Sequence, residues 1–259
     1  MFSRYRRILG EIRRSYPPEK ARAEARGEFL AYILFRPVSF YVTPFLILAG
    51  FTANGVTALG MVVAGLLPLA AGFGGAHAYA WVAGLLLVHQ VLDCADGNVA
   101  RTSGRPTILG AMLDGVGTLL SWTCYMIAVG LLAGPGATNW IGRHGAAVGL
   151  GVALAFVLQR QLEDTYSHYF GESVPLAPSL PVAPAGTAAG PRFSLGDFAK
   201  LFEQPVAIGG VLVAGAGGWM EYFLAGLAVY QCGAVLLWLP RFIRSIRRRA
   251  GQPDARDPR

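Results

Sequence analysis

Long apolar runs separated by short polar breaks dominate the chain and predict a bundle of membrane-spanning helices. Most runs come close to the ~20 residues that a helix needs to cross a lipid bilayer, although the fifth is short. We therefore expect an all-α integral membrane protein built as a bundle of six transmembrane helices. The six spans are expected at 54–73, 76–92, 107–132, 145–162, 205–217 and 219–239, the last one stopping at Pro240.

The two longest segments outside these runs have patterns of their own. Residues 1–27 are polar and helix-prone, with a break at a Pro-Pro pair. Residues 28–50 are apolar but contain one arginine and two prolines, so we expect an interfacial amphipathic helix that lies along the membrane. Residues 165–203 are rich in proline and small residues, which predicts a flexible loop rather than a domain, with short interfacial helices as candidates at its flanks, 166–169 and 193–202.

The composition supports the membrane class. Of the 259 residues, 54% are hydrophobic and only 14% are charged, and the mean hydropathy is +0.45. In soluble domains, about a quarter of the residues are charged. The three cysteines are widely spaced and offer neither a disulfide framework nor a metal-binding spacing.

The net charge of +7 is concentrated at the two ends of the chain. Eight basic residues lie between Arg4 and Arg26, and five arginines lie between Arg241 and Arg249. Because positive charge near spans marks the inner side, both termini and the 165–203 loop are expected in the cytoplasm, with the chain in the inner (cytoplasmic) membrane. Basic tails also occur in nucleic-acid-binding proteins, but tails that flank spans more often report topology, so we expect no nucleic-acid partner.

Polar residues between the second and third runs have the spacing of a functional site. Asp93 and Asp96 are three residues apart and share one helix face, and Gly110 and Asp114 are four apart on the next run. Charges in such a place are expensive unless something binds them. Two neighbouring helices could bring the three carboxylates around one point, where they would suit a hard cation such as Mg²⁺.

Small residues and an arginine extend this pattern. Gly97 and Ala100 leave the helix face bare, so that a polyphosphate could approach closely, and Arg101 can pair with phosphate through its planar fork. Solvated acids at two helix ends would explain one or two aspartates. They would not explain three acids, small residues and an arginine in register.

The run from 93 to 118 resembles the signature of the CDP-alcohol phosphotransferase family, D-x-x-D-G-x-x-A-R, eight residues, G-x-x-x-D-x-x-x-D. The matching positions are Asp93, Asp96, Gly97, Ala100, Arg101, Gly110 and Asp114. The resemblance implies a six-helix bundle, usually dimeric, with a polar cavity that is open to the cytoplasm. We accordingly expect three parts in the chain: a basic tail with an interfacial helix (1–50), a membrane catalytic domain (51–240) and a second basic tail (241–259).

The resemblance also implies an activity. Members of the family transfer a substituted phosphate from a CDP-linked donor, here favoured to be CDP-diacylglycerol, to an acceptor alcohol in phospholipid synthesis, and they release CMP. Asp93, Asp96 and Asp114 would hold Mg²⁺ or Mn²⁺, and Arg101 would take phosphate charge. Gly97 and Ala100 would make room for the nucleotide, while Gly110 would open the facing helix. Membrane lipids and a second copy of the chain are the expected partners.

A short element upstream adds two candidates for substrate binding. Asn54 and Thr57 match the polar positions of a P-N-x-x-T-like element of the family, with Ala53 in place of the proline. They would help to hold the nucleotide. An N-cap and a helix-start hydroxyl explain the two residues equally well.

The last signature position departs from the family. Thr118 stands where the family has a fourth aspartate, the base that takes the acceptor's proton, and a general base is worth roughly 10²–10⁴-fold in rate. A substitute base could come from Glu163, Asp164 or His168, or the acceptor could attack already ionised. Alternatively, the chain is a catalytically silent member that binds nucleotide or lipid without turnover, or it is an engineered variant made to trap a complex.

We expect an enzyme rather than a silent binding protein. A transporter is a weaker alternative, since the chain is short and lacks an inverted repeat. The acceptor stays open among inositol phosphate, glycerol phosphate, serine, choline and ethanolamine. Arg160 would favour a phosphorylated acceptor, although an arginine at the end of a span is more often a topology anchor.

Overall fold

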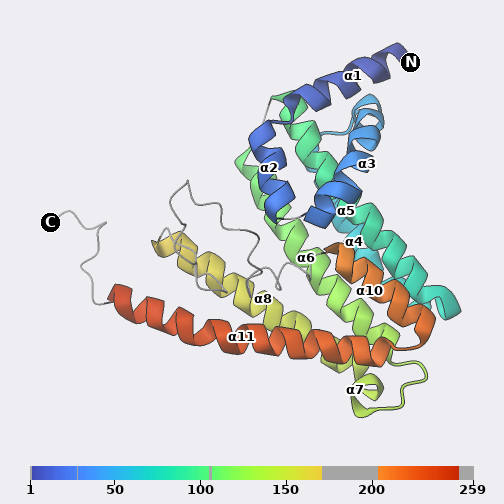
Figure 1. Cartoon of the computed structure of the whole chain (residues 1–259), viewed down its shortest axis with the longest axis vertical. Helices are drawn as coiled ribbons and strands as arrows, with labels where there is room; N and C mark the ends of the chain where they lie inside the picture. Colours follow the sequence, from blue (N-terminus) through green and yellow to red (C-terminus); the bar gives the residue numbers. More distant parts are fainter. Residues whose placement is uncertain (1, 28, 105–106, 171–203, 251–259) are drawn as a thin grey trace, which may run out of the picture.

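The computed structural model describes residues 2–27, 29–104, 107–170 and 204–250, and these are almost entirely helical, with no strand among them (Figure 1). The N-terminal helices are α1 (Phe2–Ser15), α2 (Pro18–Gly27) and α3 (Phe29–Leu48). The helices of the bundle are α4 (Ala53–Phe73), α5 (Ala78–Ser103), α6 (Ile108–Ala133), α7 (Trp140–Arg143), α8 (Gly145–Phe170), α10 (Gln204–Gly217) and α11 (Met220–Ala250), and a 3₁₀ turn, η1 (Gly75–His77), precedes α5.

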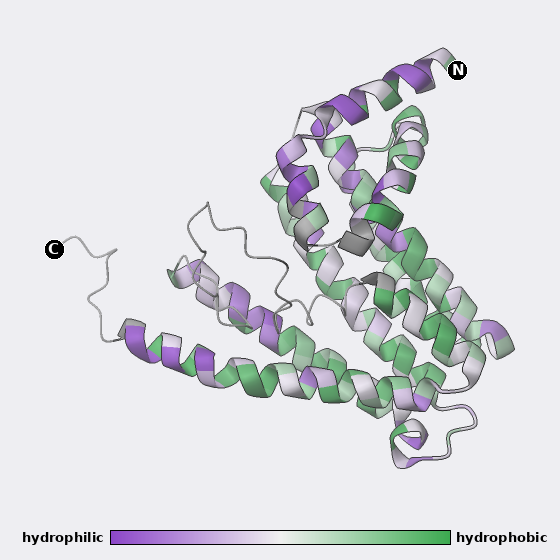
Figure 2. Cartoon of the chain, in the orientation of Figure 1, coloured by the Kyte–Doolittle hydropathy of each residue, from purple (hydrophilic) through white to green (hydrophobic). Residues whose placement is uncertain are grey.

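Within the described part of the chain, five helices are long and apolar enough to cross a membrane. They span Ala53–Phe73, Gly75–Ser103, Ile108–Ala133, Gly145–Phe170 and Met220–Arg248. Figure 2 shows their apolar central parts, in contrast to the hydrophilic α1 and α2 and to the hydrophilic far ends of α8 and α11. The chain is thus an all-α membrane protein, as predicted. The expected fifth span corresponds to the shorter α10, so the total of six spans stays a prediction.

Helices α4, α5 and α6 form the centre of the structure. Helix α4 packs against both α5 and α6, and α3 and α10 pack against α5. Helix α8 packs on α6 and on α11, and the pair α8 and α11 extends away from the central three (Figure 1). Helices α1 and α2 pack on α3 and lie near the end of α5 that carries the aspartates.

Local signals fix the ends of the helices near this motif. The side chains of Thr52 and Thr107 cap α4 and α6 by accepting from the backbone N–H groups of Gly55 and Gly110. Helix α5 ends at Gly104, whose φ of 63° lies in the left-handed region that favours glycine. The chain can therefore turn sharply after the first half of the motif and begin α6 with the second half.

Glycines let α6 and α8 approach backbone to backbone. A Cβ atom on Gly130 would overlap the carbonyl oxygen of Gly145, and one on Gly149 would lie 2.6 Å from the carbonyl oxygen of Met126. Small residues at such contacts are how helices pack closely in lipid, where no hydrophobic effect drives them together. The glycines therefore fix the contact of α8 with the central helices.

Helices α8 and α11 extend beyond the predicted spans, and the candidate helix at 166–169 is the last turn of α8. Helix α8 continues to Phe170, and α11 does not stop at Pro240 but continues to Ala250. Tyr166 of α8 forms a buried cluster with Trp238 and Phe242 of α11, whose rings stack at 4.5 Å between centroids. This packing holds both helices past the ends of their apolar runs. The rest of the predicted loop, 171–203, and the tail 251–259 lie outside the described residues.

The N-terminal segment forms three helices. Two polar helices separated at the Pro-Pro pair occupy residues 2–27, and the apolar segment forms the continuous helix α3. Ile8 and Ile12 on α1 are buried, and α1 packs on α3. The predicted helix within 28–50 is confirmed, while its orientation along the membrane stays a prediction.

Candidate functional site

One cavity of about 500 Å³ brings the aspartate motif together. It lies between the end of α5 and the starts of α4 and α6, with further walls from α2 and α3. The predicted residues that line it are Asp93, Asp96, Gly97, Ala100, Arg101, Gly110 and Asp114 of the signature, together with Asn54 and Thr57. Residues up to 60 positions apart thus face one space, as the motif spacing led us to expect.

Asp96 is the buried carboxylate of this group. Its side chain is only 8% exposed, and its Oδ2 lies 2.7 Å from Oγ1 of Thr57 on α4. The same hydroxyl lies 3.1 Å from the carbonyl oxygen of Ala53, so its proton is directed to the nearer carboxylate. A charged group out of water needs such a donor. Thr57 therefore supports Asp96 rather than only its own helix.

The other two aspartates face the same cavity from different sides. Asp93 is partly buried on α5, whereas Asp114 is exposed on α6. Asp114 is close enough to Asp96 for their charges to interact. In residues 2–27, 29–104, 107–170 and 204–250, no three His, Cys, Asp or Glu side chains are grouped tightly enough to hold a metal ion as they stand.

The donor set nevertheless fits Mg²⁺ or Mn²⁺. Three carboxylates around a polar cavity are the oxygen ligands that hard cations prefer. Two like charges that interact also repel each other, and a cation between them would offset this repulsion. The metal ligands Asp93, Asp96 and Asp114 stay a prediction.

Arg101 is held beside the carboxylates by two contacts. Its Nη2 donates to Oδ1 of Asn98 at 2.7 Å, and its guanidinium lies over the ring of Tyr16, 5.7 Å from the ring centroid. Its buried Nε has no acceptor among the described residues. A Cβ atom on Gly97 would lie 3.1 Å from Nη1 of Arg101. The bare face at Gly97 therefore leaves room for this guanidinium as well as for a ligand.

Asn54 and Gly110 meet across α4 and α6. A Cβ atom on Gly110 would lie 3.1 Å from Oδ1 of Asn54 and 3.1 Å from Oγ1 of Thr107. Glycine at this position thus lets α6 begin close to α4. Thr52, not Asn54, caps α4, so an N-cap role does not account for Asn54, which lines the cavity instead.

Thr118 lies one turn beyond Asp114 on α6. Its side chain is exposed, and its hydroxyl donates to the carbonyl oxygen of Asp114 at 3.1 Å. It is not among the described residues that line the cavity. A threonine bonded to its own helix offers no proton acceptor comparable with a carboxylate.

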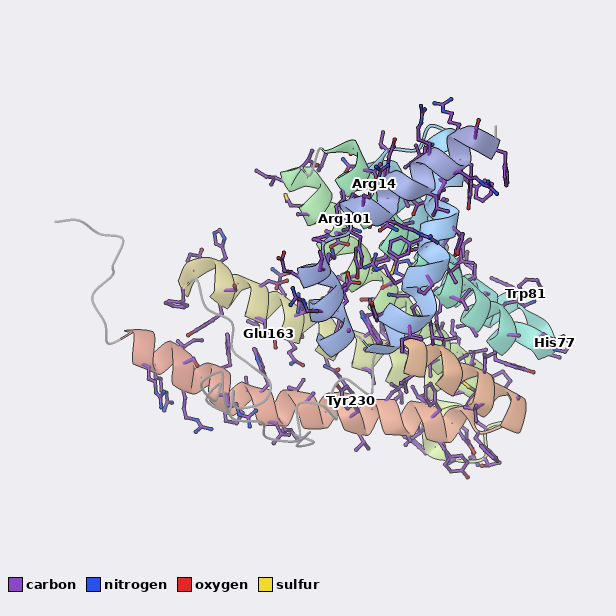
Figure 3. The ribbon with its side chains drawn as sticks, turned by 45° about the horizontal axis from the view of Figure 1, so that its top comes forward. Arg14, His77, Trp81, Arg101, Glu163 and Tyr230 are labelled. Atoms are coloured by element: carbon purple, nitrogen blue, oxygen red, sulfur yellow. The ribbon has the colours of Figure 1, made fainter. Side chains whose placement is uncertain are left out.

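The residues proposed as substitute bases lie on α8, which does not contribute to the described lining of the cavity. Glu163 and Arg160 instead line a separate, mostly apolar pocket of about 200 Å³ between α6, α8, α10 and α11. Arg160 pairs with Asp164 at 3.5 Å and with Glu163 at 4.0 Å, and His168 is exposed. Glu163 lies apart from Arg101 (Figure 3). Roles for these four residues in the chemistry stay predictions.

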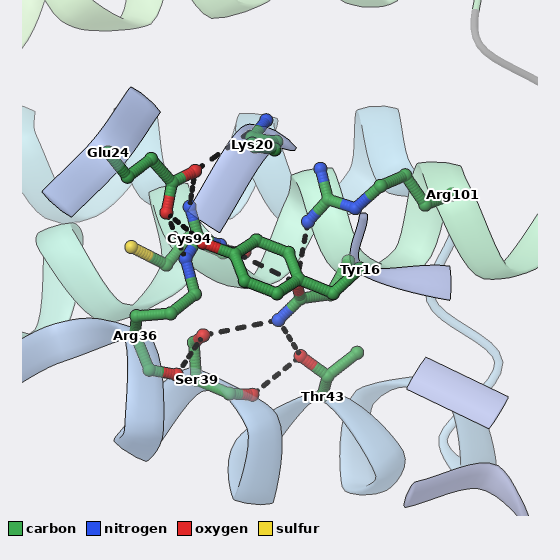
Figure 4. Close-up of polar contacts among 9 residues, drawn as sticks. Tyr16, Lys20, Glu24, Arg36, Ser39, Thr43, Cys94 and Arg101 are labelled. Atoms are coloured by element: carbon green, nitrogen blue, oxygen red, sulfur yellow. Dashed lines mark hydrogen bonds and ion pairs between the residues drawn. The ribbon is translucent and has the colours of Figure 1, made fainter. Parts of the chain in front are cut away.

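Several residues of the cavity were not singled out by the sequence. They are Lys20, Arg36, Gln90, Cys94, Thr107 and Ala111. Arg36 is 9% exposed, forms an ion pair with Glu24, and donates from Nη1 to the carbonyl oxygen of Cys94 at 3.1 Å (Figure 4). The signal that could have identified it is a lone arginine within an otherwise apolar segment.

Comparison with known proteins agrees with this geometry. The model of the CDP-alcohol phosphatidyltransferase family matches residues 50–230, well over half of the chain. No curated protein matches the chain. The matched range contains the entire signature and the helices that carry it, which confirms the resemblance. The chain therefore belongs to the CDP-alcohol phosphatidyltransferase family, whose members transfer phosphate-linked groups from CDP-alcohols in lipid synthesis.

Proposed function

We propose that the chain transfers a substituted phosphate from a CDP-linked donor, with CDP-diacylglycerol favoured, to the hydroxyl of an alcohol acceptor and releases CMP. One observation carries the proposal: all seven matching signature residues and both polar residues of the upstream element line a single cavity. Its volume of about 500 Å³ is within the range of roughly 300–1,000 Å³ typical of small-molecule sites.

The reaction forms one bond and breaks another at the same phosphorus atom. The acceptor oxygen attacks the phosphorus that carries the lipid, the bond to the CMP oxygen breaks, and CMP leaves with that electron pair while the acceptor's proton passes to water. A bound divalent cation would neutralise the pyrophosphate and polarise the phosphorus. Thr57 keeps Asp96 oriented toward the cavity, and Arg101 supplies a fixed positive charge for phosphate oxygens.

The nucleotide requires space next to these charges. Gly97 and Ala100 on α5 and Gly110 on α6 present small surfaces to the cavity, and Asn54 faces it from α4. We assign these residues to the nucleotide. The same proposal includes Mg²⁺ or Mn²⁺ as the cation and a homodimer as the assembly. It also places the cavity and both termini in the cytoplasm, because the arginine-rich ends of the chain favour that side.

A second candidate is a silent member that binds the nucleotide or lipid without turnover. The observation that favours it is the exposed hydroxyl of Thr118, which donates to its own helix where the family has a base. Under this alternative, the donor still binds, but no group removes the proton from the acceptor, so no transfer follows. We favour activity because Thr118 is the one departure from the signature, and the seven other signature residues line the cavity.

The deciding experiment measures CMP release and CDP binding by the purified chain in lipid, with Mg²⁺ or Mn²⁺. CDP-diacylglycerol and a panel of acceptor alcohols are supplied to the native chain and to the Asp96→Asn and Thr118→Asp variants. The proposal expects CMP release from the native chain with one acceptor and none from Asp96→Asn. Turnover by Thr118→Asp alone would establish the silent alternative. Absence of both CDP binding and CMP release would refute both functions.

A further inference from the structure

Five side chains from three parts of the chain, Arg101 among them, form a closed ring of contacts (Figure 4). Tyr16 donates to Oε2 of Glu24 at 2.6 Å, and Nε of Arg36 donates to the same oxygen at 2.8 Å. Arg36 reaches Oδ1 of Asn98 at 3.5 Å, and Arg101 donates to that oxygen at 2.7 Å. The aromatic ring of Tyr16 contacts both guanidiniums and thereby completes the ring of contacts.

Asn98 is the most tightly fixed member of this ring. It is 0% exposed, and its Nδ2 donates to the hydroxyls of Ser39 and Thr43, both at 3.1 Å. Those hydroxyls donate to the carbonyl oxygens of Arg36 and Ser39. Their lone pairs are therefore left to accept from the amide. This arrangement settles which end of the carboxamide is the oxygen, and it directs that oxygen at Arg101.

The two guanidiniums of the ring differ in their charge partners. Glu24 forms an ion pair with Arg36 and compensates its charge. Within the described residues, no carboxylate lies within 4.0 Å of Arg101. Its partner is the neutral oxygen of Asn98, which orients a guanidinium without cancelling its charge. Arg36 thus acts within the fold, whereas Arg101 keeps its charge available to the cavity.

The hydroxyl of Tyr16 remains a hydrogen-bond donor over the physiological pH range. It lies between α1 and α2, and burial, followed by the hydrogen bond to Glu24, raises the pKa of its hydroxyl above the ordinary value. The hydroxyl therefore stays protonated and remains a donor to Glu24. The aromatic ring of Tyr16 lies against the guanidinium of Arg101, 5.7 Å from the ring centroid to the guanidinium carbon (Figure 4).

We propose that Asn98 is a positioning residue that, together with Tyr16, holds the guanidinium of Arg101 ready for a phosphate oxygen of the CDP-linked donor. The inference rests on the proposed function and deepens it. Asn98 occupies a variable position of the signature, and Tyr16, between α1 and α2, lies outside residues 50–230, so the N-terminal segment of this chain helps to position Arg101. A side chain that is already oriented loses less conformational freedom when the ligand arrives.

The test is a double-mutant cycle on equilibrium binding of radiolabelled CDP with Mg²⁺, using the purified full chain. Asn98→Leu removes the acceptor at a similar volume, and Arg101→Ala removes the group that it positions. We expect Asn98→Leu to weaken CDP binding about 10-fold when Arg101 is present and less than about 2-fold in the Arg101→Ala background, as for residues that act as a unit. Ser103→Ala is the matched control, since this exposed residue of α5 loses one hydrogen bond to its own helix.

Tyr16→Leu keeps the proposal testable if Asn98→Leu unfolds, which the melting temperature would report. This variant removes the ring over Arg101 from a partly buried position, and it should show the same dependence on Arg101. If the variants lose CDP affinity equally with and without Arg101, Asn98 and Tyr16 have only a structural role. That result would overturn the inference, although the proposed function would stand. If the native chain binds no CDP, the proposed function fails, and the inference fails with it.

Discussion

The hydroxyl of Thr57 lies 2.7 Å from a carboxylate oxygen of Asp96, across 39 residues of sequence and between two helices. This contact joins the upstream polar element to the aspartate motif. It means that α4 does more than cover the cavity, because it supplies a hydrogen-bond donor to the most buried acid of the site. The first prediction follows from this pair.

Replacing Thr57 with valine keeps the volume and removes the hydroxyl. A hydrogen bond to a charged group contributes about 1.5–3 kcal/mol, so CMP release and Mg²⁺-dependent CDP binding should both fall by roughly 10-fold or more. Thr123→Val is the matched control, because the hydroxyl of Thr123 donates only to the carbonyl oxygen of Leu119 in its own helix. Native activity in Thr57→Val would show that Asp96 does not depend on this donor.

A second prediction concerns the close approach of α4 and α6. In Gly110→Ala, the added methyl group would lie 3.1 Å from Oδ1 of Asn54 and from Oγ1 of Thr107, so both groups must shift by a few tenths of an ångström. We expect weaker CDP binding with little change in the unfolding temperature, because the shift is confined to two side chains at the starts of α4 and α6. Gly115→Ala, where the Cβ atom meets nothing within 4 Å, should bind CDP as the native chain does. Equal binding by the two variants would contradict the assignment of Gly110 to the nucleotide.

Much of the site could be predicted because its order is local. Asp93 and Asp96, like Gly110 and Asp114, share a helix face through spacings of three and four residues, which any helix preserves. Apolar runs likewise gave the positions of the long helices. The turn at Gly104 then brings the two halves together, and the cavity contains all of these residues.

Contacts between distant polar residues could not be predicted in this way. Arg36 and Asn98 are 62 residues apart, and nothing in either local pattern names the other as its partner. The lone arginine in an apolar segment indicated a buried or interfacial charge, but Glu24, which pairs with it, lies in a polar helix with several other charged residues. Pairing of this kind depends on how α2 and α3 pack on α5.

The C-terminal ends of α8 and α11 also differ from the predicted ends of the spans, and the reason is again a tertiary contact. The apolar periodicity stops near residue 162 on α8 and at Pro240 on α11, so a sequence pattern ends both helices there. In the structure, Phe242 of α11 and Tyr166 of α8 lie beyond those points, and both pack with Trp238. The contacts of this buried aromatic cluster offset the hydrogen bond that Pro240 removes from α11.

A third prediction tests the glycine contact between α6 and α8. In Gly149→Ala, the added methyl group would lie 2.6 Å from the carbonyl oxygen of Met126, which is backbone and cannot move away cheaply. Overpacking of this kind costs about 1–3 kcal/mol, so the unfolding temperature in detergent should fall. Gly151→Ala on the same helix meets nothing within 4 Å and should be neutral or stabilising by up to about 1 kcal/mol. If both variants unfold at the native temperature, the two helices are not packed as closely as these glycines indicate.

A fourth prediction concerns the cation, and it has a readout that does not depend on turnover. If Asp93, Asp96 and Asp114 hold Mg²⁺, the ion binds the native state and stabilises it by about 2.7 kcal/mol at 100 times its Kd. The unfolding temperature of the native chain should therefore rise with added Mg²⁺ and return to its starting value after chelation.

The variants separate a specific site from general binding of the ion to acidic groups. Asp114→Asn removes the exposed carboxylate that interacts with Asp96, so it should shift the Mg²⁺ dependence of the unfolding temperature to higher concentrations. It should also relieve the repulsion between the two carboxylates and raise the unfolding temperature without Mg²⁺. Asp164→Asn, which changes an exposed acid on α8 that does not line the cavity, should leave the Mg²⁺ dependence unchanged. An identical Mg²⁺ response in the native chain and in Asp114→Asn would mean that the cation does not bind between these carboxylates.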